Sequence, residues 1–414
     1  MTPAELRRSR IAVITYFFIL GAATAAWSAR LPAIKAALHL SDGRLGLALF
    51  AVPAGSVVTL AFSGRIADRF GPGRVMRIGG LACPLALIPI GAAGGLGWLM
   101  AALACYGAMG GLLDVAMNAC GARLEVGYGR PILSSLHAGY SIAGLAGAGI
   151  GALSAGLGIG VLPTLAATAA VLIAGGLVAG PRVAIPPPAP HSASPGGHAA
   201  PRGHPEPHGP GTPPFFSRFP PWALILSMGL LALFGQVGEG SAGDWSAVYL
   251  HVDLHSPAAF AAAGLAAFSV MMAAGRVVGD RLAGRFGPVR LVRASGLLAG
   301  LGLAAGLLIG TPAAAVAGFA LLGAGLAGIF PQIVSAAVRL DPARAGRTIG
   351  QIAAIAYSGL LSGPVVIGAV ASGVGLRDAL LLPAALAVVV AILAGTLNAS
   401  SPARRSPATT GSSR

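Results

Sequence analysis

Four acidic side chains lie within or at the edges of long apolar runs of this 414-residue chain. They are Asp114, Glu125, Glu239 and Asp244. An ionisable side chain in an apolar environment is costly, and such residues usually bind ions or polar solutes or transfer protons. We therefore take these acids and their polar neighbours as the first candidates for chemistry.

Asp114, Asn118 and His137 form one candidate group. Asp114 and Asn118 are spaced i, i+4, on one face of a helix. Asp114 lies nine residues before Arg123 and His137 seven residues after Arg130, so both lie roughly 10 to 13 Å from the same membrane face. Because a histidine titrates near neutrality and a buried carboxylate readily takes up a proton, the group can pass protons. The alternative is a structural hydrogen bond between Asp114 and His137 that joins two helices.

A second group lies in the segment FGQVGEGSAGDW, where Gln236 and Glu239 share a helix face at i, i+3. Its repeated glycines predict a loosened or broken helix, and broken membrane helices bind solutes and ions. Glu239 is thus a candidate proton-coupling carboxylate. Alternatively, Arg30, at the end of the first apolar run, pairs with Glu239 or Asp244 as an outer gate.

Two later segments combine helix-breaking and polar residues. The string GIFPQ places Gln332 beside Pro331, and the string YSGLLSGP begins at Tyr357. A proline interrupts the helical hydrogen-bond ladder and permits a hinge, while Gln332 and Tyr357 can bind a hydroxyl-bearing solute. A kinked helix that serves only packing is the alternative.

The composition indicates which elements position these residues. The chain is 55% hydrophobic and 9% charged, with a mean hydropathy of +0.80, so it has too little polar surface for a soluble globule of this length. Apolar runs of helix-spanning length number twelve. They cover 11–29, 44–63, 75–94, 97–121, 132–156, 159–180, 222–243, 257–279, 291–310, 312–337, 347–371 and 376–396.

A loop repeat divides these runs into two halves. The string GRIADRFGPGR at 64–74 recurs in altered form as GDRLAGRFGPVR at 279–290, about half the chain later, and both copies lie in short basic loops between apolar runs. Internal repeats of this kind are typical of membrane transporters. We expect an all-α membrane protein with twelve transmembrane helices in two pseudo-symmetric six-helix bundles.

The formal charge of +15 would suit a nucleic-acid-binding protein, but the positions of the basic residues contradict that interpretation. With both termini inside, all but four of the 27 Lys and Arg fall on the inner side. The four others are Arg30, Lys35, Arg44 and Arg377. The positive-inside rule therefore predicts cytoplasmic termini and no nucleic-acid partner. The preference for Arg, Ala, Gly and Pro suggests a GC-rich bacterium, and hence a multi-pass protein of its inner membrane.

The chain divides at a proline-rich segment. Nearly half of its 31 prolines lie between 181 and 221, which predicts a cytoplasmic linker between an N-terminal bundle at 1–180 and a C-terminal bundle at 222–414. Four histidines in the linker could bind a metal, but their irregular spacing favours a passive linker. They are His191, His198, His204 and His208. We expect no metal site, no cofactor and no enzymatic activity, because no phosphate-binding loop or nucleophile–base arrangement is evident.

The chain, apart from the linker and the tails, resembles a transporter of the major facilitator superfamily. The resemblance rests on the loop GRIADRFGPGR and, for a fucose-permease-like branch, on DVAMNACGARLE and AGDWSAVYL. It implies that Asp68 accepts hydrogen bonds at the start of the eleventh helix and that Arg69 and Arg74 hold an inner gate. An anion is favourable at a helix N-terminus.

In the second copy of the loop, Gly284 stands at the position of Asp68 and precedes Arg285. Asp280 lies one turn earlier on the same face and can substitute. We nevertheless expect an asymmetric gate, in which Asp68 and Arg69 carry more of the closure than Asp280 and Arg285.

The resemblance implies secondary active transport of a small solute by alternating access. We expect proton-coupled symport of a sugar-like or other small polar metabolite by a monomer in the lipid bilayer. A proton-driven efflux antiporter of drugs or metabolites is the first alternative. A non-transporting membrane receptor on the same fold is the second.

Overall fold

The structure, a computed structural model, describes residues 1–40, 42–185, 220–261 and 263–398. Twelve helical spans in this part are long and apolar enough to cross a membrane, as the apolar runs predict. Most of the expected linker, with its four histidines, lies outside the described residues. The structure therefore does not test whether the linker binds a metal.

The first six spans are built from α1 to α8. Their bounds are α1 Pro3–Ser28, α2 Leu31–Ala37, α3 Asp42–Phe70, α4 Pro72–Leu85, α5 Leu87–Gly91, α6 Leu96–Tyr128, α7 Leu133–Gly156 and α8 Val161–Ala179. The short α2 precedes the second span, and α4 with α5 makes the third. We call this set the first bundle.

The last six spans form the second bundle. Their elements are α9 Pro221–Val248, α10 Ala258–Ala261, α11 Ala263–Phe286, α12 Pro288–Ile309, α13 Pro312–Leu326, α14 Ile329–Leu340, α15 Ala345–Val374, α16 Leu376–Ala379 and α17 Leu381–Leu393. Short non-α turns follow α8, α9 and α17: η1 Gly180–Arg182, η3 Tyr249–Asp253 and η4 Ala394–Asn398.

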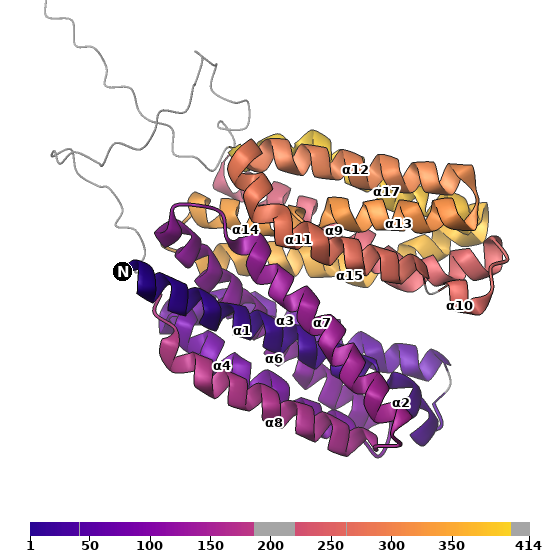
Figure 1. Ribbon diagram of the computed structural model, residues 1–414, viewed down its shortest axis with the longest axis horizontal. Helices are drawn as coiled ribbons and strands as arrows, with labels where there is room; N and C mark the ends of the chain where they lie inside the picture. Colours follow the sequence, from indigo (N-terminus) through magenta and orange to yellow (C-terminus); the bar gives the residue numbers. More distant parts are fainter. Residues whose placement is uncertain (41, 186–219, 262, 399–414) are drawn as a thin grey trace, which may run out of the picture.

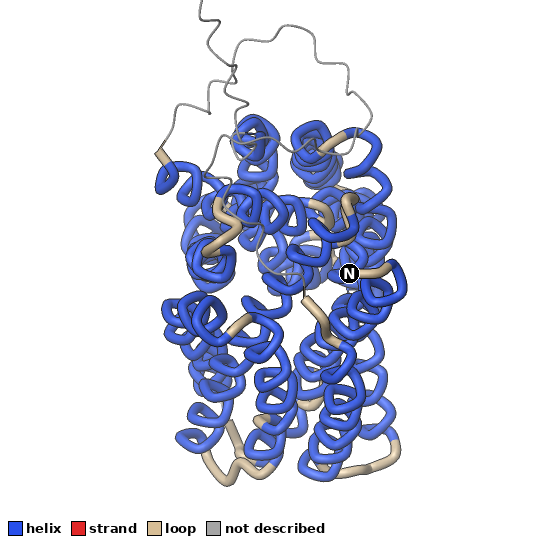
Figure 2. The backbone as a smooth tube through the Cα atoms, turned by 90° about the vertical axis from the view of Figure 1, so that its left-hand side faces the viewer, coloured by secondary structure: helices blue, strands red, loops and turns tan. Residues whose placement is uncertain are grey.

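The two bundles lie side by side, with their helices running along the same direction (Figures 1 and 2). The main contacts between them are made by α3 with α15 and by α7 with α11. These are equivalent pairs, because α3 and α11 are the second helices of their bundles and α7 and α15 the fifth. The contact between the bundles therefore follows the internal symmetry.

The helix breaks agree only in part with those that the glycines and prolines predict. The expected break in the seventh span is wrong, because α9 runs through Gly238, Gly240 and Gly243 without interruption. The tenth span is broken near GIFPQ, where its proline predicts a hinge, since α13 ends at Leu326 and α14 begins at Ile329. The small residues Ala327 and Gly328 lie at the break, and Gly328 is the first residue of GIFPQ, three positions before its proline.

Close backbone contact between α3 and α6 depends on glycine. A Cβ at Gly107 would lie 1.9 Å from the carbonyl oxygen of Val52, and one at Gly55 would lie 2.0 Å from that of Ala104. Small residues at such positions let helices pack closely in lipid, where no hydrophobic effect drives their association. This packing holds α6, the helix of Asp114, against its neighbour.

We expect Gly107→Ala to lower the melting temperature of the detergent-solubilised protein, because the added methyl group forces α3 and α6 apart at a cost of about 1–3 kcal/mol. Gly97→Ala is the matched control in the same helix, since a Cβ there meets nothing within 4 Å. Thermal unfolding followed by tryptophan fluorescence measures both. Equal melting temperatures for the two variants would contradict the close α3–α6 contact.

Candidate functional site

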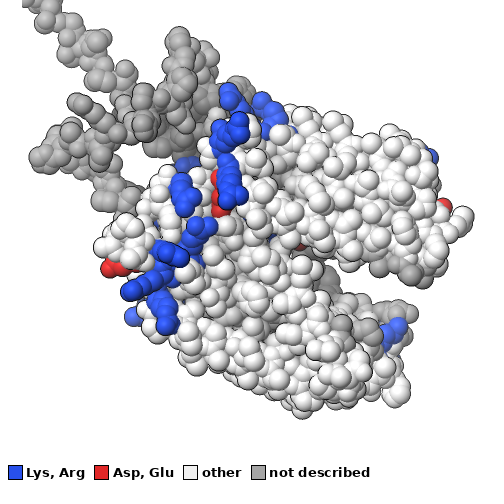
Figure 3. Space-filling model, viewed as in Figure 1, with Lys and Arg blue, Asp and Glu red and all other residues white. Residues whose placement is uncertain are grey.

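A cavity of about 240 Å³ lies between the two bundles. Its lining combines apolar side chains with polar ones from both bundles. The polar lining residues are Thr24, Ser56, Tyr106, Asp114, His137, Tyr140, Gln236, Glu239, Arg276 and Tyr357. Figure 3 shows the molecule hollowed between the bundles at the end opposite the gathered Lys and Arg side chains, which we call the basic end. The cavity therefore belongs to a conformation open away from the basic end.

The structure brings Asp114, Asn118 and His137 together. The Asn118 amide group donates to Asp114 Oδ1 at 3.0 Å, and Asn118 Oδ1 is 3.1 Å from His137 Nε2. Asn118 is fully buried, while Asp114 and His137 are 8% and 7% exposed and line the cavity. The His137 ring also packs edge-on against Phe17 of α1 and Phe330 of α14. Asn118 thus fixes two titratable side chains at the cavity wall.

This geometry limits how protons can pass through the group. Asn118 donates to Asp114 and must accept from His137, which places the proton of a neutral His137 on Nε2. An amide that donates on one side and accepts on the other does not exchange protons as a hydroxyl or an imidazole does. Asp114 and His137 therefore meet protons from the cavity rather than through Asn118.

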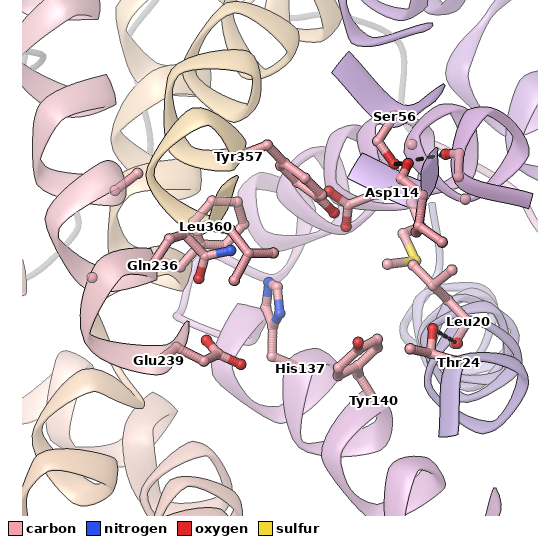
Figure 4. Close-up of a pocket in the computed structure, with 18 of the residues that line it drawn as sticks. Leu20, Thr24, Ser56, Asp114, His137, Tyr140, Gln236, Glu239, Tyr357 and Leu360 are labelled. Atoms are coloured by element: carbon pink, nitrogen blue, oxygen red, sulfur yellow. Dashed lines mark hydrogen bonds between the residues drawn. The ribbon is translucent and has the colours of Figure 1, made fainter. Parts of the chain in front are cut away.

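The opposite wall carries Gln236, Glu239 and Tyr357. Figure 4 shows His137 beside Gln236 and Glu239, and Tyr357 pointing toward Asp114. Within the described chain, the side chains of Gln236 and Glu239 have no hydrogen-bond partner in the protein. Their amide and carboxylate groups are available to a solute.

The sequence analysis missed Arg276 as a cavity residue, because it placed this arginine near the inner end of a span ending at 279. The helix α11 continues to Phe286, so Arg276 lies ten residues, or roughly 15 Å, from that end. Arg276 is 9% exposed, lines the cavity and donates from Nη1 to Ser141 Oγ of α7 at 2.6 Å. The sequence does contain a signal for Arg276, because the segment MMAAGRVVG places an arginine among apolar residues on both sides.

Three expected site residues lie elsewhere. Arg30 is buried and donates to the backbone oxygens of Gly151 and Ile159 in its own bundle, so it does not pair with Glu239 or Asp244 in this conformation. Asp244 is exposed, and Gln332 is buried in α14; neither lines the cavity. The proposed outer gate is therefore not formed here.

Two carboxylates connect the bundles at the basic end. Asp68 of α3 accepts hydrogen bonds from the backbone N–H groups of Gly346 and Arg347 at 3.1 and 3.0 Å, at the start of α15. Asp280 of α11 accepts from Ser134 and Ser135 at 2.8 and 3.0 Å, at the start of α7. We call these contacts the two latches.

The expected asymmetry of the gate is wrong in this structure. Asp280 replaces the carboxylate missing at Gly284 and makes the same pair of contacts as Asp68, because one helical turn returns it to the face that meets α7. Arg69, Arg74 and Arg285 are exposed. Arg69 and Arg285 lie over the rings of Phe70 and Phe286, their own neighbours, rather than across the bundle contact.

Glu125 makes a third connection that the sequence analysis did not assign. One carboxylate oxygen accepts from the N–H groups of Ile132 and Leu133 at 2.8 and 3.1 Å, at the start of α7. The other accepts from Ser335 of α14 at 2.5 Å. Glu125 thus orders the α6–α7 turn and attaches it to the second bundle.

Comparison with known proteins identifies the family. The profile of the Major Facilitator Superfamily matches residues 12–312 and 245–413. The chain belongs to this superfamily. It is 30% identical over 384 residues to the transporter y4wD of Sinorhizobium fredii, covering 92% of this chain and 96% of that protein. It is 31% identical to the membrane protein MosC of Rhizobium meliloti, over 92% of this chain and 88% of that one.

The fold agrees with the family assignment. The Escherichia coli fucose:proton symporter FucP, solved in the outward conformation, superposes with a TM-score of 0.70 at 17% identity, over 93% of this chain and 97% of that one. The protein is therefore a multi-pass secondary transporter with bacterial relatives and not an enzyme, and its substrate is a small molecule.

We expect Asp68→Asn and Asp280→Asn each to open the basic end more often, because each removes the anion at a helix N-terminus. A loss of about 1 kcal/mol shifts the population roughly fivefold. Spin labels at Val126 and Ala343, on opposite bundles and with the three native cysteines replaced, report the distance by electron–electron double resonance.

Asp341→Asn is the control for both latches, since its carboxylate accepts from Arg344 within its own loop. A shift in Asp68→Asn without one in Asp280→Asn would show that closure is asymmetric after all.

Proposed function

We propose that the protein is a proton-coupled symporter of a small polar solute, with Asp114 as its proton-binding carboxylate. The observation that carries the proposal is the Asp114–Asn118–His137 group at the wall of a cavity between the two bundles. Asp114 has no cation within ion-pair distance among the described residues, and an unpaired buried carboxylate is costly when ionised. A proton from the cavity removes that cost.

Three features support a polar solute. Gln236 and Glu239 present polar groups that have no hydrogen-bond partner in the described chain, Tyr140 and Tyr357 add hydroxyls, and the cavity volume of about 240 Å³ suits a small molecule. Ligand sites typically combine an apolar wall with a few such groups. The fold likeness to the fucose:proton symporter FucP is consistent with this class.

The charge asymmetry supports the orientation. From the positive-inside rule we propose that the basic end faces the cytoplasm, with both termini on that side and the cavity open to the outside of a bacterial inner membrane. The six-plus-six arrangement encloses the cavity within one chain, so we propose that a monomer suffices.

We expect Asp114→Asn to lose solute-driven proton entry by at least tenfold while retaining solute exchange, because an amide cannot carry the proton but leaves the cavity in place. Proteoliposomes that contain the pH dye pyranine, given monosaccharides and small carboxylates in turn, measure proton entry. Counterflow of radiolabelled solute measures exchange. Asp253→Asn, an exposed acid beyond α9, is the control.

Three outcomes would contradict parts of the proposal. Uncoupling by Glu239→Gln with full coupling in Asp114→Asn would move the proton site to α9. Proton movement opposite to the solute would indicate an efflux antiporter. Absence of solute flux in the unmodified protein would favour the receptor alternative.

A further inference from the structure

We propose that Arg276 binds a carboxylate of the transported solute, so that the substrate is a small carboxylate rather than a neutral sugar. This inference rests on the proposed function of the cavity and specifies the chemical class of its solute. The geometry of the Arg276 guanidinium group carries it.

The guanidinium group has an unused binding edge. Nη1 donates to Ser141, while Nε is buried without any hydrogen-bond partner and Nη2 has none in the described chain. Nε and Nη2 lie on the same edge of the planar group and bind the two oxygens of a carboxylate in parallel. Ser141 therefore holds the side chain through Nη1, which is not needed for a carboxylate bound at Nε and Nη2.

Arg276 has no ion-pair partner among the described residues. The side chain is 9% exposed at the cavity wall, and the described residues include no carboxylate in an ion pair with it. A buried cation with an unsatisfied donor is costly, and removal of that cost by an anionic ligand favours binding. Arginine also keeps its charge at physiological pH, so the site cannot relieve the cost by losing a proton.

The backbone on both sides of Arg276 is held closely. A Cβ at Gly275 would lie 2.7 Å from Cβ of Ala327 at the break between α13 and α14. A Cβ at Gly279 would lie 2.7 Å from Cβ of Ser134 at the start of α7. These contacts place Arg276 on a rigid element, as a binding residue requires.

The remaining cavity groups describe the rest of the solute. Glu239 accepts hydrogen bonds, and Gln236 both donates and accepts. A solute that places its carboxylate on Arg276 therefore satisfies Glu239 best with a hydroxyl or ammonium donor. Hydroxy acids, sugar acids and amino acids share this chemistry, and the cavity volume restricts them to small members.

A structural role is the competing explanation, because the Arg276–Ser141 hydrogen bond joins the two bundles. Ser141→Ala separates the two roles. It removes the bond between α11 and α7 but leaves the charge and the free edge of Arg276.

The experiment measures the melting temperature of the detergent-solubilised protein against ligand concentration, without any proton gradient. The probes are D-galacturonate with D-galactose, and L-serine with L-serinamide; each pair differs at the carboxylate. We expect at least one carboxylate to stabilise the unmodified protein and its partner not to. Arg276→Gln should weaken that binding by about 10- to 100-fold, as expected for a bidentate charged contact. Arg276→Lys should retain part of it and Ser141→Ala most of it.

Three results would overturn the inference: equal binding of galactose and galacturonate, equal loss in Ser141→Ala and Arg276→Gln, or no stabilisation by either carboxylate at millimolar concentration. Stabilisation by galacturonate would show that a hydroxyl donor is sufficient at Glu239, whereas stabilisation by serine alone would favour the ammonium group, which galacturonate lacks. The binding assay contains no proton gradient, so a lack of proton coupling in liposomes would not contradict carboxylate binding by Arg276. Conversely, a lack of carboxylate binding would still allow proton-coupled symport of a neutral solute.

Discussion

The arrangement of the bundles depends on an electrostatic contact made twice. Asp68 and Asp280 each bind two of the free N–H groups at the start of a helix in the other bundle, where the helix dipole also favours an anion. Both contacts lie at the basic end and hold it closed, so the cavity opens at the other end. Hydrogen bonds to exposed N–H groups can be exchanged for water, and this makes the closure reversible.

One of these contacts is linked to the cavity through a single pair of helices. On α11, Arg276 lies one turn above Asp280; on α7, Ser141 lies two turns beyond Ser134. Arg276–Ser141 and Asp280–Ser134 are thus successive connections between the same two helices. A solute bound to Arg276 contacts α11, the helix that carries Asp280 one turn further on. Solute binding can therefore affect the Asp280 latch at the basic end through this one helix.

Hydropathy was sufficient to predict the twelve spans. The Asp114–Asn118–His137 group could be predicted from the i, i+4 spacing of the first two residues and from the equal depth of His137 in the next span. Arg276 was missed because the predicted span stops at 279, before Asp280 and Arg281, and so puts Arg276 near its end, whereas α11 continues to Phe286. The latch made by Asp280 depends on the packing of α11 against α7. A pattern within one sequence segment does not predict which helices pack together. The glycines of α9 were misread for the same reason, since Leu326 and Leu360 pack against Gly238 and Gly240 and support a continuous helix.

The charges of the cavity explain how a proton and a solute become linked in the proposed cycle. Closing the outer end excludes water, and every unpaired charge then becomes more costly. Asp114, Glu239 and Arg276 line the same cavity, and no ion pair joins them in the described chain. A proton on Asp114 removes one charge, a solute carboxylate compensates Arg276, and a donor on the solute binds Glu239. With either the proton or the solute absent, at least one ion remains uncompensated, so closure requires both.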